Sequence, residues 1–123
     1  MEKSCIFCKF VKGEISCEKI YENDNFFSVL DVNPKVKGHS LIIPKKHFKT
    51  CLDLPSSLGI ELLDCIKKTS LKLIKDFNAD GFNIINNNFK SAGQVVNHFH
   101  FHILPRKDGD GKVLDLFYKK ECL

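Results

Sequence analysis

A chain of 123 residues is long enough for one compact domain and too short for a second hydrophobic core. Hydrophobic residues make up 43% and charged residues 28%, an ordinary globular composition that excludes extensive disorder. The formal net charge of +4 is carried almost entirely by lysine, with Arg106 as the only arginine. This charge favours anionic partners such as phosphates. Because the lysines are dispersed and arginine is almost absent, we do not expect a nucleic-acid partner.

No stretch of the sequence is apolar for long enough to cross a membrane. Its richest run, residues 41–43, ends at Pro44, whereas a membrane helix needs about 20 apolar residues. The first residues have no apolar core of the signal-peptide kind, so we expect a cytoplasmic protein. Six cysteines then favour free thiols over a disulfide framework.

The expected elements begin with a short helix from Cys5 to Lys12, which Gly13 ends. Strands follow at residues 20–22 and 26–30, joined by a turn, and a third strand spans residues 39–44 after a break at residues 31–34.

Apolar residues then recur at helical spacing from Ser56 to Phe77, where Ser56 or Ser57 is the expected N-cap. Two more strands are expected at residues 82–86 and 98–104, the latter halted by Pro105, with a short final element over residues 113–118. This order predicts a single α+β domain over residues 1–123, with a largely antiparallel five-stranded sheet and one long helix.

Three histidines alternate with apolar residues in the last of these strands. Because successive side chains of a strand point to opposite faces, His98, His100 and His102 share one face, about 6–7 Å apart. Phe99, Phe101 and Ile103 occupy the other face, where they can pack against the long helix.

Imidazoles arranged in a row can divide the tasks of nucleophile, acid and base at neutral pH. A phosphorus centre suits such a row, because phospho-imidazole intermediates form readily and are easily hydrolysed. A strand that binds a metal, or a merely exposed strand, is the plainer alternative.

Residues 98–104 match the His-φ-His-φ-His-φ-φ signature of the histidine triad family at every position. The segments 5–9, 31–34, 38–47, 81–83, 92–94 and 102–106, together with Asn87, resemble the Hint-like branch in the same order. The resemblance covers roughly residues 4–106. It implies a homodimer whose sheet extends across both subunits. It also implies a purine nucleotide substrate, an AMP or GMP derivative cleaved at the α-phosphate, such as a nucleoside phosphoramidate or an adenylated group.

The resemblance also implies a role for individual residues. His100 becomes the nucleophile of a nucleotidyl-histidine intermediate, and His102 contacts the phosphate or the leaving group. His98 orients His100, partly through its backbone carbonyl. Asn87 and Gln94 correspond to polar contacts on the phosphate side.

The nucleoside has its own expected contacts. The carboxylate of Asp31 corresponds to the group that binds the ribose hydroxyls, which are good partners for a carboxylate. Taken without the family, Asp31 is a turn residue at a strand end and Phe7 a core residue. The residues expected to line the base pocket are Ile6, Phe7, Phe10 and Val32.

A structural zinc site is also predicted. Cys5 and Cys8 are spaced to chelate one ion, and without a second C-x-x-C the remaining ligands would be histidines, with His47 and His98 as candidates. Zinc-containing members of the family have the same arrangement. Such a four-coordinate site has no open position for chemistry. The alternative is a pair of reduced or transiently oxidised thiols. We interpret His39 as a structural histidine, hydrogen-bonded within the strand pairing.

The chain departs from the family pattern at two positions. Val95 stands where many Hint-like members have a serine that can donate to the leaving group, and Asn97 replaces an aromatic residue. Val95 keeps open a nucleotide-binding regulatory module with vestigial catalysis, and a dinucleoside polyphosphate hydrolase is the nearest rival among enzymes. Residues 107–123 are expected to form a C-terminal tail that contacts the dimer partner.

Overall fold

The computed structural model describes residues 5–111, so the predicted final element at residues 113–118 and most of the predicted tail lie outside the described residues. The helices are α1 (Ile6–Lys12) and α2 (Gly59–Phe77), with short 3₁₀ turns η1 (Cys51–Asp53), η2 (Ser56–Leu58) and η3 (Lys90–Ala92). The strands are β1 (Lys19–Glu22), β2 (Phe26–Leu30), β3 (Ser40–Pro44), β4 (Gly81–Ile85) and β5 (Phe101–Arg106).

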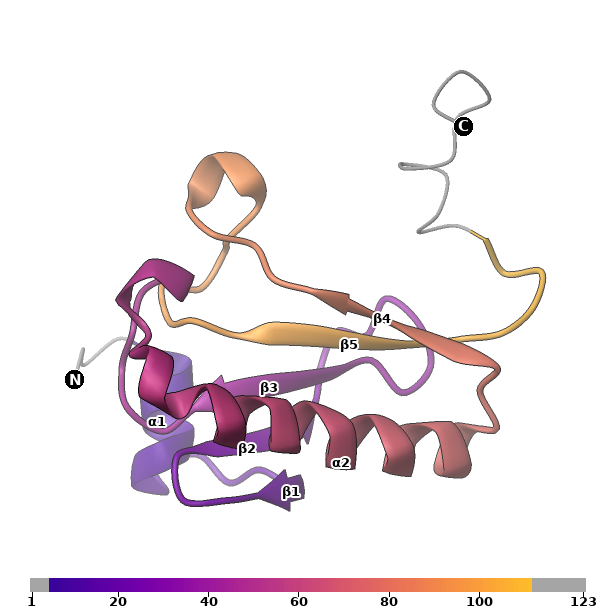
Figure 1. Cartoon of the computed structure of the whole chain (residues 1–123), viewed down its shortest axis with the longest axis horizontal. Coiled ribbons are helices and arrows are strands. Elements are labelled where there is room, and N and C mark those ends of the chain that lie inside the picture. Colours follow the sequence, from indigo (N-terminus) through magenta and orange to yellow (C-terminus); the bar gives the residue numbers. More distant parts are fainter. Residues whose placement is uncertain (1–4, 112–123) are drawn as a thin grey trace.

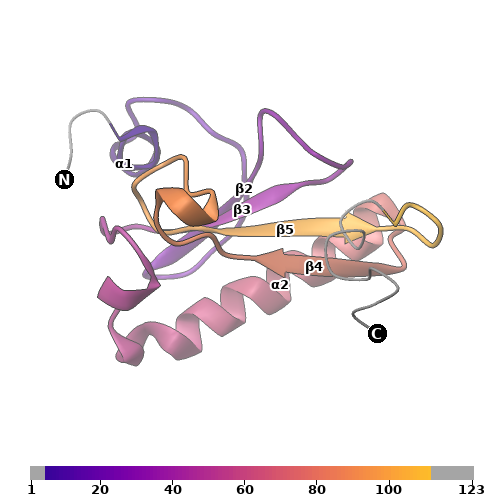
Figure 2. The ribbon, with the colours of Figure 1, turned by 90° about the horizontal axis from the view of Figure 1, so that it is seen from above.

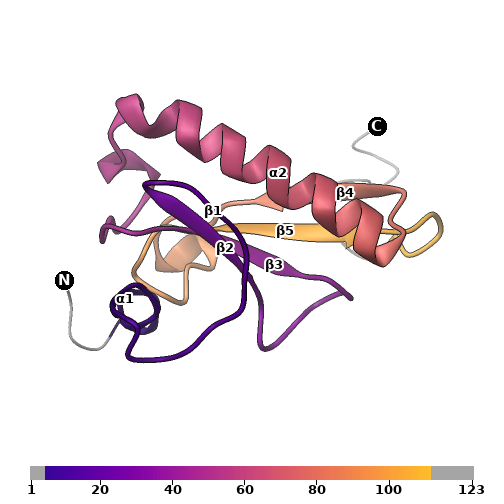
Figure 3. The same cartoon turned by 90° about the horizontal axis from the view of Figure 1, so that it is seen from below.

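The strands form one antiparallel sheet in the order β1-β2-β3-β5-β4 (Figure 1). The two helices lie on opposite faces of this sheet (Figures 2 and 3). The long helix covers one face, where Phe26, Ile42 and Ile103 pack against Cys65 and Leu73. The short helix packs on the other face; the core there consists of Cys5, Phe7, Cys8, Phe27, Val29, Leu41 and Ile43. The predicted α+β architecture is therefore confirmed.

The short helix ends as predicted and begins one residue later than predicted, at Ile6. Cys5 is its N-cap, with the Sγ atom accepting a hydrogen bond from the backbone N–H of Cys8 at 3.4 Å. Gly13 ends it in the left-handed region at φ 76°. The N-cap predicted for the long helix is wrong: Ser56 belongs to a 3₁₀ turn that leads directly into the helix, and Leu58 caps it without a side-chain hydrogen bond.

The last strand begins and ends later than predicted. Residues 98–100 precede it, and Pro105 lies within it opposite Phe82. A proline is tolerated here because β3 pairs only with Phe101 to Ile103, so no strand on that side needs an N–H group from Pro105.

The turn before β3 is closely packed against the long helix. Gly38 has a φ of 85°, and a Cβ atom at this position would lie 2.8 Å from a ring carbon of Phe77, the last residue of α2. Only glycine fits both the backbone conformation and the space. Within residues 5–111, no helix has the length and apolar character that crossing a membrane requires.

Candidate active site and metal centre

A pocket of about 550 Å³ opens on the face of the sheet that carries α1. Its wall contains both His100 and His102, together with Asp31 from the end of β2 and Asn87 from the loop after β4. The predicted base-pocket residues Ile6, Phe7, Phe10 and Val32 also line it. The structure thus brings two of the three triad histidines together with the predicted nucleoside-binding residues.

His100 is held in one orientation by a backbone carbonyl. Its Nδ1 atom lies 2.8 Å from the carbonyl oxygen of His98, and because a carbonyl oxygen only accepts, Nδ1 carries the proton. The Nε2 atom of the neutral ring is then unprotonated, as a nucleophile requires. Burial lowers the pKa of His100, which is only 7% exposed, and so favours this neutral form.

His102 and His39 form a hydrogen-bonded pair beside it. The backbone N–H of Lys35 donates to Nδ1 of His39 at 3.0 Å, so the neutral ring of His39 carries its proton on Nε2. That Nε2–H group donates a hydrogen bond to Nδ1 of His102, 2.9 Å away. His102 therefore carries its own proton on Nε2. Burial, aided by the neighbouring His100, lowers the pKa of His102 to about 4.

We expected His39 to be a structural histidine, hydrogen-bonded within the strand pairing. The structure instead places its buried ring in the pocket wall, with hydrogen bonds to the backbone of Lys35 and to His102. The signal that could have revealed this is the alternation His39, Leu41, Ile43, which places His39 on the α1 face. The alternation alone does not bring His39 to His102. That also requires β3 to pair with β5, where Leu41 lies opposite His102, and no local pattern in the sequence specifies this pairing.

Asp31 completes a group of three polar side chains with His39 and His102. One carboxylate oxygen lies 3.4 Å from Nε2 of His39, and the other accepts a hydrogen bond from the backbone N–H of Asn33. The three side chains are close enough to surround a cation. However, the N–H of Lys35 occupies the lone pair of His39 Nδ1, so Nε2 is protonated and cannot ligate. The group is better described as a hydrogen-bonded relay.

Gln94 lies behind the pocket wall. Its side-chain oxygen accepts from the backbone N–H of Phe89 at 2.7 Å, and its amide donates to the carbonyls of Lys49 and Val96 at 2.6 and 3.0 Å. These bonds hold the loop that carries Val95, which lines the pocket and is 91% exposed. Gln94 is therefore bonded to Val96, a residue of the pocket wall, but does not itself line the pocket.

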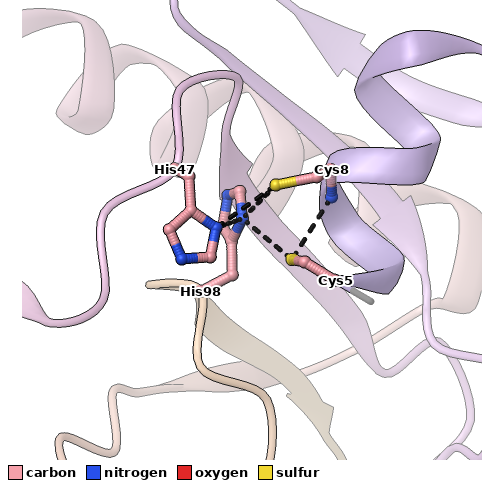
Figure 4. A group of neighbouring side chains, drawn as sticks. All are labelled: Cys5, Cys8, His47 and His98. Carbon is pink, nitrogen blue, oxygen red and sulfur yellow. Dashed lines mark hydrogen bonds between the residues drawn. The ribbon is translucent and has the colours of Figure 1, made fainter. Parts of the chain in front are cut away.

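The four predicted zinc ligands form a second cluster (Figure 4). Nδ1 of His98 lies 3.3 Å from Sγ of Cys5, 3.5 Å from Sγ of Cys8 and 3.1 Å from Nδ1 of His47. Sγ of Cys8 lies 3.2 Å from Nδ1 of His47. The structure thus brings all four ligand atoms together.

The donors of this cluster suit a tetrahedral zinc ion. Nε2 of His98 lies 2.8 Å from the carbonyl oxygen of Pro44 and must donate to it, which leaves Nδ1 unprotonated and directed at the thiols. This is the outer hydrogen bond that orients metal-ligating histidines. The ring is fully buried, and burial lowers its pKa to about 4, so it is neutral. Two cysteines and two histidines are the ligand set of a closed structural zinc site.

Comparison with known proteins places these features in a family. The model of the HIT domain matches residues 12–109. The adenosine 5′-monophosphoramidase HNT1 of Candida albicans is 41% identical over 109 residues, covering 85% of this chain and 72% of that protein. The adenylylsulfatase HINT3 of Arabidopsis thaliana is 42% identical over 110 residues, covering 89% of this chain but only 56% of that longer protein.

A solved structure agrees with this match. The crystal structure of a zinc-bound histidine triad family protein of Mycobacterium smegmatis superimposes with a TM-score of 0.81 at 37% identity. The superposition covers 87% of this chain and 78% of that one. Sequence, fold and site geometry agree, and the chain belongs to the HIT (histidine triad) family.

Proposed function

We propose that this protein is a nucleotide hydrolase that cleaves purine nucleoside 5′-phosphoramidates or adenylated compounds at the α-phosphate, through a nucleotidyl intermediate on His100. The observation that carries the proposal is the hydrogen bond from Nδ1 of His100 to the carbonyl of His98, which leaves an unprotonated Nε2 in the pocket wall. The names of two relatives, an adenosine 5′-monophosphoramidase and an adenylylsulfatase, support the reaction class.

The reaction has two steps. Nε2 of His100 attacks the α-phosphorus, and the bond from phosphorus to the leaving nitrogen or oxygen breaks. A departing amine takes its proton from a water in the pocket, while the Nε2–H group of His102, whose tautomer the bond from His39 fixes, donates a hydrogen bond to the departing atom. In the second step the hydroxide so formed attacks the phosphorus of the intermediate, and the bond from phosphorus to His100 breaks. The products are the amine and the nucleoside monophosphate.

The substrate's other parts have partners in the same pocket. Asp31 receives the ribose hydroxyls, and Asn87 donates to the phosphate. Gln94, assigned to the phosphate side by family resemblance, acts there through the loop it holds. The apolar residues Ile6, Phe7, Phe10 and Val32 enclose a purine base.

Zinc, bound by Cys5, Cys8, His47 and His98, would be structural and would pin α1 to the sheet. The zinc-bound relative supports this assignment. The cluster has four ligands and takes no part in the chemical steps, so its contribution is to the folded state.

The exposed edge strand β4 supports a homodimer in which the sheet extends across both subunits. This strand is the last of the sheet, and Phe82 and Ile84 on it are 40% and 46% exposed. Pairing with the same strand of a second copy would extend the sheet and cover both side chains. Sedimentation equilibrium tests this: Ile84→Lys should shift a dimeric wild type to monomer, and a monomeric wild type would contradict the proposal.

The test of the reaction is trapping of the intermediate. Protein incubated with a slowly released adenylate analogue and analysed by mass spectrometry should gain one nucleotidyl group, mapped to His100. The variant His100→Ala should gain none, lose turnover and keep its affinity for AMP. Comparing adenosine phosphoramidate with a dinucleoside tetraphosphate separates the proposed activity from polyphosphate hydrolysis. Undiminished turnover by His100→Ala would refute the mechanism.

A further inference from the structure

The ring of Phe7 packs against the nucleophile. The ring centroids of Phe7 and His100 lie 5.0 Å apart with the planes at 79°, and those of Phe7 and His98 lie 5.6 Å apart at 81°. Phe7 is 5% exposed and His100 7%, so solvent has little access to the two packed rings. His100 is thus held at Nδ1 by the carbonyl of His98 and on its side by Phe7.

The helix that carries Phe7 depends on the cysteine cluster for its position. It has seven residues, and a helix so short does not persist without tertiary contacts. Phe7 lies between Cys5, the N-cap, and Cys8, and the Sγ atoms of both lie within 3.5 Å of Nδ1 of His98. One cluster therefore fixes two of the three groups that contact the His100 ring, the backbone of His98 and the ring of Phe7; the third is the ring of His102, whose centroid lies 4.9 Å away.

We propose that Phe7 is a positioning residue for His100, fixed in place by the cluster of Cys5, Cys8, His47 and His98. The inference rests on the proposed function and deepens it, because it gives α1 a part in the rate of nucleotidyl transfer beyond the wall it offers to the base. Without the ring of Phe7, His100 retains its hydrogen bond to the carbonyl of His98 and the ring of His102 on one side, and its imidazole can swing towards the space that Phe7 filled. The attacking Nε2 atom then spends less time aligned with the phosphorus.

Kinetics of Phe7→Leu separates positioning from base binding. Leucine keeps an apolar surface for the base and removes the ring that contacts His100. Positioning predicts a fall in kcat of about tenfold to a hundredfold, with affinity for AMP nearly unchanged. A residue that only binds the base would raise KM and leave kcat at the wild-type value, and that result would overturn the proposal.

The matched control is Phe26→Leu. Phe26 is fully buried on the α2 face and makes none of the contacts of Phe7 with the histidines, so the same truncation disturbs packing elsewhere. Its kcat per folded molecule should stay within about twofold of the wild type. A fall in kcat equal to that of Phe7→Leu would assign the effect to general loss of packing and would also overturn the proposal.

Nitrogen-15 NMR of the histidine rings provides a readout that needs no turnover. In the zinc-loaded wild type, His100 should give one sharp Nδ1–H tautomer. Phe7→Leu, or removal of zinc by a chelator, should broaden this signal or mix the tautomers, while Phe26→Leu should not. An unchanged His100 signal in Phe7→Leu would refute the positioning role. If the wild type did not cleave a phosphoramidate, the proposed function would fail, and the NMR comparison would still decide the role of Phe7.

Discussion

Nε2 of His39 lies 2.9 Å from Nδ1 of His102, and the backbone N–H of Lys35 occupies the other nitrogen of His39. These two hydrogen bonds fix the proton positions on both rings, and they leave His102 with a proton on the nitrogen available to a leaving group. A loop amide thereby determines which nitrogen of His102 can donate a hydrogen bond to the leaving group.

Removing His39 should therefore slow the departure of amines. His39→Leu removes the donor, so we expect kcat for adenosine phosphoramidate to fall about a hundredfold. His39→Gln can offer an amide N–H in a similar place and should recover much of the loss. A substrate whose leaving group departs as a stable anion, such as a nitrophenyl ester of AMP, needs little protonation and should lose far less. Equal losses for both substrates would contradict the relay.

The low pKa of His102 predicts an acid-sensitive fold. In the folded protein its pKa is about 4, against an ordinary value of 6.5, so between these values the unfolded chain binds more protons. The free energy of unfolding should then rise with pH from 4 to 6.5, and this contribution should level off above that. Urea denaturation across this window should show a shallower pH dependence in His102→Asn, by up to one proton. Any acid loss of zinc is common to both proteins and cancels; identical slopes would contradict the prediction.

Metal removal should destabilise the protein through the cluster on α1. If free zinc exceeds its dissociation constant a thousandfold, binding stabilises the fold by about 4 kcal/mol, and a chelator should remove that amount. Cys8→Ser should start from the lower stability and respond little to the chelator. Cys17→Ser, a thiol outside the cluster, is the control and should respond like the wild type. Calorimetry with metal analysis measures both effects, and a chelator-insensitive wild type would argue for a plain thiol pair.

Gln94 and Asn87 should respond to truncation in opposite ways. Gln94→Ala removes the three hydrogen bonds that the buried Gln94 side chain makes with the backbone of Phe89, Lys49 and Val96, which should cost about 1–3 kcal/mol of stability. Asn87→Ala, in the pocket wall, should change stability little and raise KM. Denaturation and steady-state kinetics on both variants distinguish the two roles. Full stability with reduced kcat in Gln94→Ala would place its side chain on the substrate instead.

Much of the fold was predictable because local patterns specified it. The alternation over residues 98–104 correctly placed the histidines opposite Phe101 and Ile103, which pack towards α2, although the strand itself begins only at Phe101. The predicted end of β5 was wrong, because whether a proline breaks a strand depends on how the neighbouring strands pair with it. The pairing of β3 with β5 decides this at Pro105, and it is not visible in local sequence.

The functional site was predictable only where local sequence patterns identify its residues. The C-x-x-C spacing and the histidine pattern identify chemical groups, and the family resemblance assigns them roles. The relay through His39 needs the register of two strands that are distant in sequence. The place of Gln94 needs the course of a loop around Lys49, to which it is bonded. Non-local packing of this kind determines which polar groups reach the pocket.

The contact between Gly38 and Phe77 links the position of a pocket residue, His39, to the packing of the long helix on the opposite face of the sheet. The last ring of the long helix rests against the backbone immediately before His39, with no room for even a methyl group. A bulkier residue at position 38, or a shift in the end of α2, would push on that backbone and tilt the imidazole that faces His102. A sequence change at the end of α2, in a part of the core that does not line the pocket, would thus reach the hydrogen bond between His39 and His102.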